Sequence, residues 1–150
     1  FLTAHYTMSD ELVVEIDNPK FSEKGLDDRV YEIKAKKGYK SDDVLKLVTV
    51  KGKFKTEKDG KWIYLEADKG DFSQSINYIE LEKNIFIYTD DGEKIRANQA
   101  TFDMNKDEIK LEKSVSHENM KGTILSESSI ISNNFNKIMY AGNVRSIFRN

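Results

Sequence analysis

The sequence predicts an all-β protein in which strand pairs repeat along the chain and stack into an open, elongated antiparallel sheet. Three observations predict this fold class: the apolar residues are strand formers, they alternate with polar residues, and a pattern recurs about every 30 residues. Of the 150 residues, 38% are hydrophobic and 33% are charged. Globular domains average about 25% charged residues. The length fits one domain over residues 1–150, and the composition favours a thin or open one.

Strand-forming residues dominate the apolar composition. The chain has 14 Ile and 8 Val against 9 Leu, together with 8 Phe, 7 Tyr and 1 Trp. β-branched and aromatic side chains pack well on a pleated surface. Apolar and polar residues alternate over 62–67, 85–88 and 109–112, and no window of a dozen residues has an apolar stripe of helical period. Each alternating run is therefore expected to be a strand.

Turn residues separate these runs at regular intervals. Asp59-Gly60, Asp90-Asp91-Gly92 and Lys121-Gly122 each stand just before a new alternating run. Asp and Gly readily adopt the backbone conformations of tight turns. We therefore interpret the acidic pairs as turn residues and not as catalytic carboxylates; these pairs are Asp27-Asp28, Asp42-Asp43 and Asp90-Asp91. Pro19 is expected at a bend or at an unpaired edge position near the first strand.

Four segments align as an internal repeat. A small residue recurs at Ala35, Ala67, Ala97 and Ser126, in steps of 32, 30 and 29 residues, and a second small residue follows three positions later in each unit. A spacing of three breaks the two-residue period of a strand. We therefore expect a bulge or corner at this point, which would return both small residues to one face of the sheet.

A second element of the repeat follows fourteen residues after the small residue in the last three units. It is an apolar or aromatic residue with a β-branched residue four positions further on: Leu81 and Ile85, Leu111 and Val115, Tyr140 and Val144. The first unit matches only with a gap, through Leu47 and Val50. Each unit has room for two strands, but one hairpin cannot bury its own apolar face, so the units must stack.

The stacked sheet is expected to have one solvent-exposed polar face and one apolar face. Alternation points Lys94, Arg96, Asn98, Lys110 and Glu112 outward. The opposite face forms a continuous apolar trough. Two interpretations of this trough stay open: the packed core of a β-sandwich, or a groove that holds an apolar ligand.

Composition and motifs argue against several function classes. The formal charge is −2 with both signs interspersed, so no basic surface for nucleic acid is visible. The chain has no cysteine, and neither His5 nor His117 has a second ligand at metal-binding spacing. His117 is expected to be an exposed histidine at a strand end. No phosphate loop, dinucleotide motif or nucleophile elbow is present. The sequence thus predicts neither an enzyme nor a cofactor or metal site.

The segment Ile16-Asp17-Asn18-Pro19-Lys20-Phe21, followed ten residues later by Tyr31-Glu32-Ile33-Lys34-Ala35, resembles the alphaproteobacterial form of the LptC family, the periplasmic lipopolysaccharide-export protein C. That form typically opens its domain with an Asn-Pro-Arg/Lys-Phe step, and the later units look like its repeating strand pairs. The resemblance covers about residues 12–148. The chain departs from the family at Asp28-Arg29-Val30-Tyr31, where a Gly-Arg-Pro-Tyr type turn is common.

The resemblance implies a twisted, open β-jellyroll that transports lipopolysaccharide without catalysis. It implies a domain at the periplasmic side of the inner membrane, anchored by a membrane helix upstream of this chain. The domain would bind the acyl chains of lipopolysaccharide and pass them from the inner-membrane export transporter to the periplasmic bridging protein. Three alternatives stay open: the bridging protein itself, a β-solenoid scaffold that binds no lipid, and a carbohydrate-active β enzyme with converging acids.

Two sets of residues are expected to carry this function. The lipid groove comprises the inward positions of the repeats: Ile33, Ala35, Leu47, Ile63, Leu65, Phe72, Ile79, Leu81, Ile85, Ile95, Ala97, Phe102, Ile109, Leu111, Val115, Ile124, Ile138, Tyr140 and Val144. The partner edges are expected at the two ends of the stack, with Leu12, Val14 and Ile16 facing the transporter and Val144 and Ile147 facing the bridging protein.

Overall fold

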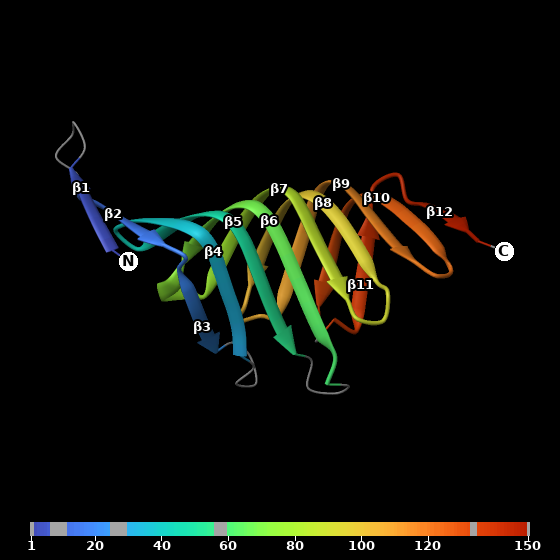
Figure 1. Cartoon of the computed structure of the whole chain (residues 1–150). Helices are drawn as coiled ribbons and strands as arrows, with labels where there is room; N and C mark the ends of the chain where they lie inside the picture. The colour runs from blue at the N-terminus through green and yellow to red at the C-terminus, as the bar shows by residue number, and fades with distance from the viewer. Residues whose placement is uncertain (1, 7–11, 25–29, 56–59, 133–134, 150) are drawn as a thin grey trace.

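The computed structural model describes residues 2–6, 12–24, 30–55, 60–132 and 135–149. Within these residues one antiparallel sheet of twelve strands carries nearly all the secondary structure, and the only helix is the short 3₁₀ turn η2 (Gln74–Ile76) (Figure 1). The sheet follows chain order from β1 to β11, except that β3 pairs with β4 and β12 pairs with β10. This arrangement confirms the predicted all-β, open antiparallel fold.

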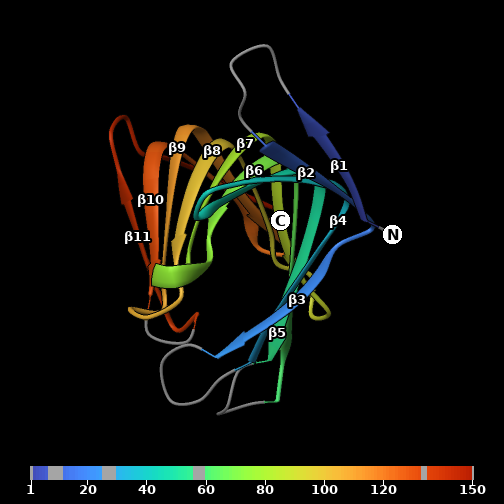
Figure 2. The ribbon, with the colours of Figure 1, turned by 90° about the vertical axis from the view of Figure 1, so that its left-hand side faces the viewer.

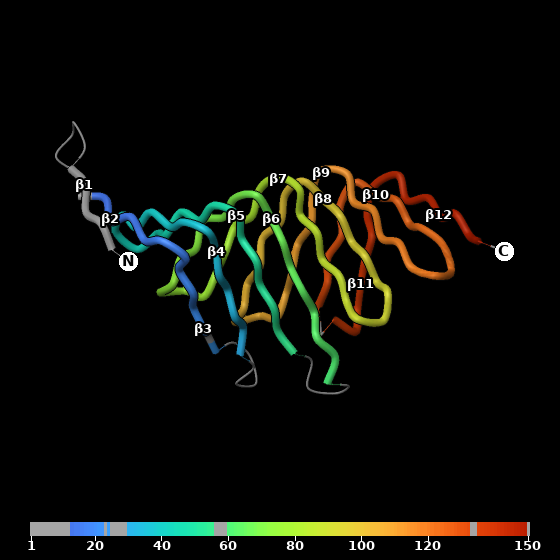
Figure 3. The backbone as a smooth tube through the Cα atoms, in the orientation of Figure 1, coloured from blue at the N-terminus to red at the C-terminus, as the bar shows by residue number. Residues whose placement is uncertain are grey.

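The strands in the middle of the sheet are long, and the terminal strands are short. Figure 3 traces the backbone as it runs back and forth through the middle strands in chain order. Their bounds are β1 (Leu2–Tyr6), β2 (Leu12–Asp17), β3 (Lys20–Lys24), β4 (Val30–Ser41), β5 (Val44–Lys55), β6 (Trp62–Ser73), β7 (Tyr78–Thr89), β8 (Lys94–Asp103), β9 (Glu108–Asn119), β10 (Gly122–Ser132), β11 (Lys137–Ala141) and β12 (Arg145–Phe148). The chain bends at Pro19 between β2 and β3, as expected, and the carbonyl of Pro19 accepts a hydrogen bond from the amide of Ala35.

The long strands are bent in the middle by β-bulges, at the places where the repeat predicted corners. Register shifts fall between Glu66 and Lys69 of β6 and between Arg96 and Gln99 of β8. In β6 and β8 two exposed or partly exposed residues separate two buried small ones, such as Ala97 and Ala100. The bulge therefore returns both small residues to the inner face, as the three-residue spacing predicted.

The neighbouring strands turn the same corner with left-handed residues. Lys83 and Asn84 in β7, and Lys113 and Ser114 in β9, all have positive φ. In β5 a single residue, Thr49, has positive φ at the corner. The shorter corner explains why the first repeat aligns only with a gap, because β5 needs one residue fewer between its two inward apolar positions.

The corners divide the sheet into two walls that face each other around an interior (Figure 2). Wall A consists of one half of each long strand together with β11: residues 38–41, 44–48, 70–73, 78–82, 99–103, 108–112 and 128–132. Wall B consists of the other halves together with β12: residues 30–35, 50–55, 62–67, 85–89, 94–97, 115–119 and 122–126. Each long strand contributes to both walls. Side chains from both walls form one core cluster.

Close packing at the corner predicts a sensitivity at Gly70. A Cβ at this position would lie 3.0 Å from a terminal methyl of Leu81 and 3.3 Å from atoms of Ile79 and Val50. Gly70→Ala is therefore expected to lower the free energy of unfolding by about 1–3 kcal/mol through overpacking. Urea unfolding measures this change, and a variant as stable as the unaltered chain would contradict the tight packing.

The N-terminal edge differs from the prediction. Leu12, Val14 and Ile16 lie in β2, which is an internal strand because β1 pairs along its whole length and β4 pairs on its other side. The expectation that these three residues form the free edge is therefore wrong. β1 was missed because a run of five residues carries too little alternation to be recognised as a strand.

The C-terminal edge consists of two short strands where one was expected. β11 pairs with Ser128–Ser132 and β12 pairs with Gly122–Leu125, so the two halves of β10 have different neighbours. Gly142 and Asn143, which both have positive φ, lie between the two strands. The edge residue Ile147 lies in β12, as expected for a terminal strand, and its side chain is exposed.

Candidate functional site

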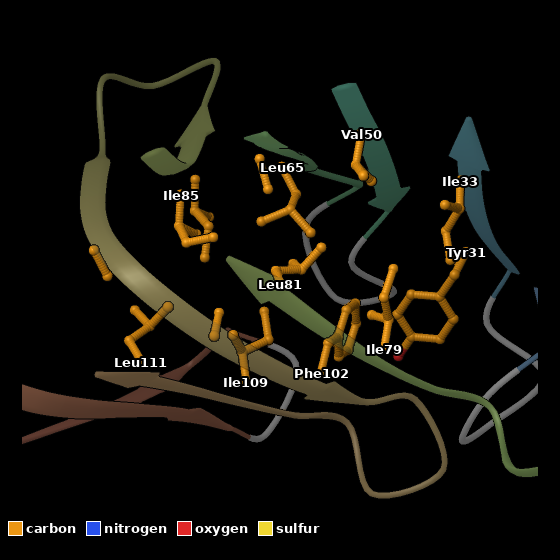
Figure 4. Close-up of a cluster of buried hydrophobic side chains, with 14 of the residues drawn as sticks. Tyr31, Ile33, Val50, Leu65, Ile79, Leu81, Ile85, Phe102, Ile109 and Leu111 are labelled. Carbon is orange, nitrogen blue, oxygen red and sulfur yellow. The ribbon is translucent and has the colours of Figure 1, made fainter. Parts of the chain in front are cut away.

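The interior between the two walls is lined by apolar side chains that point toward one another (Figure 4). Leu65, Val50 and Ile85 from wall B face Leu111 and Phe102 from wall A. All five belong to the buried core cluster. The registers of the strands align these side chains in rows across the sheet, because residues directly opposite each other on paired strands share a face.

Most of the predicted groove residues lie in this interior. The structure buries Ile33, Ala35, Leu47, Ile63, Leu65, Phe72, Ile79, Leu81, Ile85, Ile95, Ala97, Phe102, Ile109, Leu111 and Val115 in the core cluster. Ile138 packs against the cluster and is partly buried.

Three predicted groove residues lie elsewhere or are less enclosed. Ile124 and Tyr140 are only partly buried and do not belong to the core cluster. Val144 is 49% exposed and lies just before β12, so it does not line the interior as expected. The repeat fails at this point because the chain passes from wall A to wall B through Gly142 and Asn143, and Val144 follows them outside a strand.

Three aromatic rings close the interior at its N-terminal end. The Phe102 ring of wall A lies 5.0 Å from the Tyr31 ring and 5.7 Å from the Phe54 ring of wall B, centroid to centroid. The Tyr31 hydroxyl donates a hydrogen bond of 3.2 Å to the buried carboxylate of Asp107, in the turn after β8. Wall A and wall B are therefore in direct contact at this end.

A small apolar hollow remains beside these rings. Its walls include Ile33, Gly52 and Leu65, and its floor includes Ile79 and Phe102. The cavity volume is about 10 Å³, close to the minimum that holds one water molecule. In the part of the chain that the structure describes, side chains thus fill the interior around this hollow, and the two walls pack against each other there.

A buried polar cluster ties the two walls together at the C-terminal end, and it corrects the expectation for His117. The His117 side chain is 8% exposed, on wall B, where an exposed histidine was expected. Its Nε2 lies 2.5 Å from a carboxylate oxygen of Glu93, and its Nδ1 lies 2.5 Å from the Tyr140 hydroxyl of β11 in wall A. His117 lies near the end of its strand, but its side chain is not exposed, because β11 of the opposite wall covers it.

The chemistry of these groups assigns the proton positions. A carboxylate only accepts, so the Nε2–H group of His117 donates a hydrogen bond to Glu93. The Tyr140 hydroxyl, which can donate as well as accept, is the hydrogen-bond partner of Nδ1. Burial and, after it, the nearby Glu93 carboxylate raise the pKa of Tyr140. Both effects disfavour the charged phenolate, which keeps the hydroxyl available as a donor.

Sequence reasoning missed several residues that shape the interior. Leu45 and Ile87 are buried, and each lies two residues from a predicted groove residue, Leu47 or Ile85. The two-residue period of a strand could therefore have identified them. Tyr31 and Phe54 lie on the same face as Ile33 and were left out of the groove. Glu93, Met104 and Asp107 lie in or next to turns, where periodicity gives no signal.

The outer face of wall B carries stacked aromatic side chains. The Tyr64 and Tyr88 rings stack at 5.1 Å, and the Phe86 and Tyr88 rings stack at 4.8 Å. Arg96 covers the Phe86 ring at 4.1 Å, and the Tyr88 hydroxyl donates to Glu66. The faces of these aromatic rings therefore pack against neighbouring side chains of the same sheet.

In the part of the chain that the structure describes, no group of three or more His, Asp or Glu side chains could hold a metal ion. None of the helices among the described residues has the length and apolarity to cross a membrane.

A comparison with protein families gives one match over most of the chain. The model of the family described as "Lipopolysaccharide-assembly, LptC-related" matches residues 13–145. The chain belongs to the LptC family. This membership confirms the resemblance seen at Asn18-Pro19-Lys20-Phe21 and assigns the chain to lipopolysaccharide transport, at the level of the family. Among curated proteins no match is found.

Membership in the LptC family also gives the setting of the molecule. Its members are transport and bridging proteins of lipopolysaccharide export and face the periplasm. The open sheet with its apolar inner face is consistent with a β-jellyroll that serves outer-membrane biogenesis.

Proposed function

We propose that the chain, as one periplasmic domain, binds the acyl chains of lipopolysaccharide in its apolar interior. The observation that supports this proposal is the apolar lining of both walls, which runs across the sheet from β4 to β9. Burial of each methylene contributes about 0.8 kcal/mol. A twelve-carbon chain therefore contributes about 10 kcal/mol before the cost of ordering.

Because side chains fill the interior, lipid entry requires the walls to separate. The hollow at Gly52 and Leu65 is the natural starting point, since its lining is apolar and packing there is incomplete. Two hydrogen bonds hold the walls together, between Tyr31 and Asp107 beside the hollow and between His117 and Tyr140 at the other end of the interior. When the walls separate, contacts between their side chains are replaced by contacts with an acyl chain. Little apolar surface therefore faces water once the lipid is bound.

Site-specific photo-crosslinking tests this proposal. A photo-crosslinking residue at Leu65, which is 7% exposed and lines the hollow, is expected to label lipopolysaccharide. The matched control is Lys51, which is exposed on the outer face of the neighbouring strand β5. Fully buried positions such as Leu111 are less suitable, because a large residue there would disturb folding. Equal labelling at both positions, or none at Leu65, would contradict lipid binding and favour a scaffold that binds no lipid.

We further propose that the two ends of the sheet contact different partners. The edge at β1 faces the inner-membrane transporter, and the edge formed by β11 and β12 faces the periplasmic bridging protein. The C-terminal edge exposes Val144, Ile147 and Phe148. Unpaired edge strands with apolar side chains favour pairing with another sheet, which would join the two interiors.

Val144→Arg is expected to weaken binding to the bridging protein without unfolding the domain. The side chain is 49% exposed, so an arginine can reach water without entering the core. Co-purification with the bridging protein measures the effect. The control is Val48→Arg, because Val48 is 40% exposed on β5, far from this edge in the strand order. Undiminished co-purification of Val144→Arg would assign the bridging protein to another surface.

A further inference from the structure

Gly52 leaves a gap in a row of inward apolar side chains. The strand registers place Ile33, Gly52, Leu65, Ile87 and Ile95 opposite one another along wall B. The other four residues are buried members of the core cluster. Glycine weakens a strand interior because it has no side chain to pack and is more flexible when unfolded.

Neither the backbone nor the packing requires glycine at this position. Gly52 is not among the residues with positive φ. A Cβ built on it would lie 3.5 Å from the backbone oxygen of Glu32 and 3.7 Å from Leu65, which are ordinary contact distances. In contrast, a Cβ on Gly38 would lie 3.2 Å from side chains of Leu45 and Pro19, and Gly70 is tighter still. A methyl group therefore fits at Gly52.

Gly52 lines the hollow that the rings of Tyr31, Phe54 and Phe102 border. The hollow lies on the inner face of wall B, between Ile33 and Leu65, and its lining is almost entirely apolar. A glycine within a strand often marks a bulge, a tight bend, or a site where a ligand or another backbone approaches closely. Glu32 and Lys53 also border the hollow, but its exposed lining is almost entirely apolar, which favours a hydrocarbon as the occupant.

We propose that Gly52 is the specificity-determining position for acyl chains: it leaves the space into which the end of one chain inserts when the walls separate. The proposal rests on the proposed function and names the residue that sets the depth of the apolar site. Any side chain at position 52 occupies the space of the chain end. Each methylene kept out of the interior lowers the affinity about fourfold.

The test compares Gly52→Ala and Gly52→Val with the unaltered chain. Native mass spectrometry with purified lipopolysaccharide in detergent measures lipid binding, and thermal unfolding measures stability. Gly52→Ala is expected to bind lipopolysaccharide about fourfold more weakly, and Gly52→Val on the order of 50-fold more weakly. The melting temperature of Gly52→Ala is expected to stay equal or rise by a few degrees, because alanine restricts the unfolded chain and fits the folded one.

The control places the same side chain, valine, on the opposite face of β5. Lys51 is exposed, and Lys51→Val is expected to leave lipopolysaccharide binding unchanged. Unaltered binding by Gly52→Val, or a lower melting temperature of Gly52→Ala, would overturn the role of Gly52. If the unaltered chain binds no lipopolysaccharide, the proposed function itself fails, so the two failures are distinguishable.

Discussion

Phe102→Ala is expected to lower the free energy of unfolding by about 3–5 kcal/mol. The ring joins the two walls, since it lies within 5.7 Å of the Tyr31 and Phe54 rings, centroid to centroid. Alanine would remove these aromatic contacts and leave a cavity that neighbouring backbone cannot fill, because strands of both walls hold it in place. Urea denaturation of the purified domain measures the loss.

Phe148→Ala provides the matched control for this prediction. Phe148 is 79% exposed in β12, so its replacement is expected to change the stability by less than about 0.5 kcal/mol. A loss below about 1 kcal/mol for Phe102→Ala would show that the walls do not depend on each other for stability. In that case the interior would open more easily than its packing indicates.

Removal of the His117 side chain is the second large effect that the structure predicts. His117→Ala deprives Glu93 and the Tyr140 hydroxyl of their shared partner and leaves a gap between the walls. Each polar group left without a buried partner destabilises a protein by about 1–3 kcal/mol. Glu93 is partly exposed and can turn to water, so the larger share of the effect is expected from Tyr140 and from the gap.

A double-mutant cycle with Tyr140→Phe separates this contact from simple loss of volume. If the hydrogen bond joins the walls, the two replacements together are expected to destabilise less than the sum of the single effects, by about 0.5–3 kcal/mol. Additive effects would show that the two side chains act independently.

The pH dependence gives a second measurement of the same contact. Because folding raises the pKa of Tyr140, its contribution to stability is fully present at neutral pH. The contribution is lost as the pH rises through the raised pKa of the folded state, above the ordinary range near 10. Tyr140→Phe is expected to remove this alkaline loss, which urea denaturation across the alkaline range can detect.

The repeat in the sequence was sufficient to predict the corners of the sheet. Ala97 and Ala100 are both inward and three residues apart, which is compatible with a strand only if a bulge lies between them. Leu111 and Val115 frame the left-handed pair Lys113 and Ser114 in the same way. The inward residues of the middle strands followed, because alternation determines the face once the corner is known.

The edges and the polar contacts could not be predicted in this way. β1 lies outside β2 only because the two strands pair, and a run of five residues gives no signal of that pairing. His117 has the same local sequence whether or not β11 covers it. Its burial depends on Tyr140 of β11 and Glu93 of the β7–β8 turn, which are 23 and 24 residues away in the chain.

The sequence by itself determined the all-β fold, the corners and the membership in the LptC family. These are local properties, because strand formation, alternation and bulges depend on residues within a few positions of each other. Only the tertiary structure decided that the apolar faces of the two walls meet, that His117 joins them and that a hollow remains at Gly52. Those features depend on side chains that folding brings together from distant strands, and distance across a folded sheet is not encoded in local periodicity.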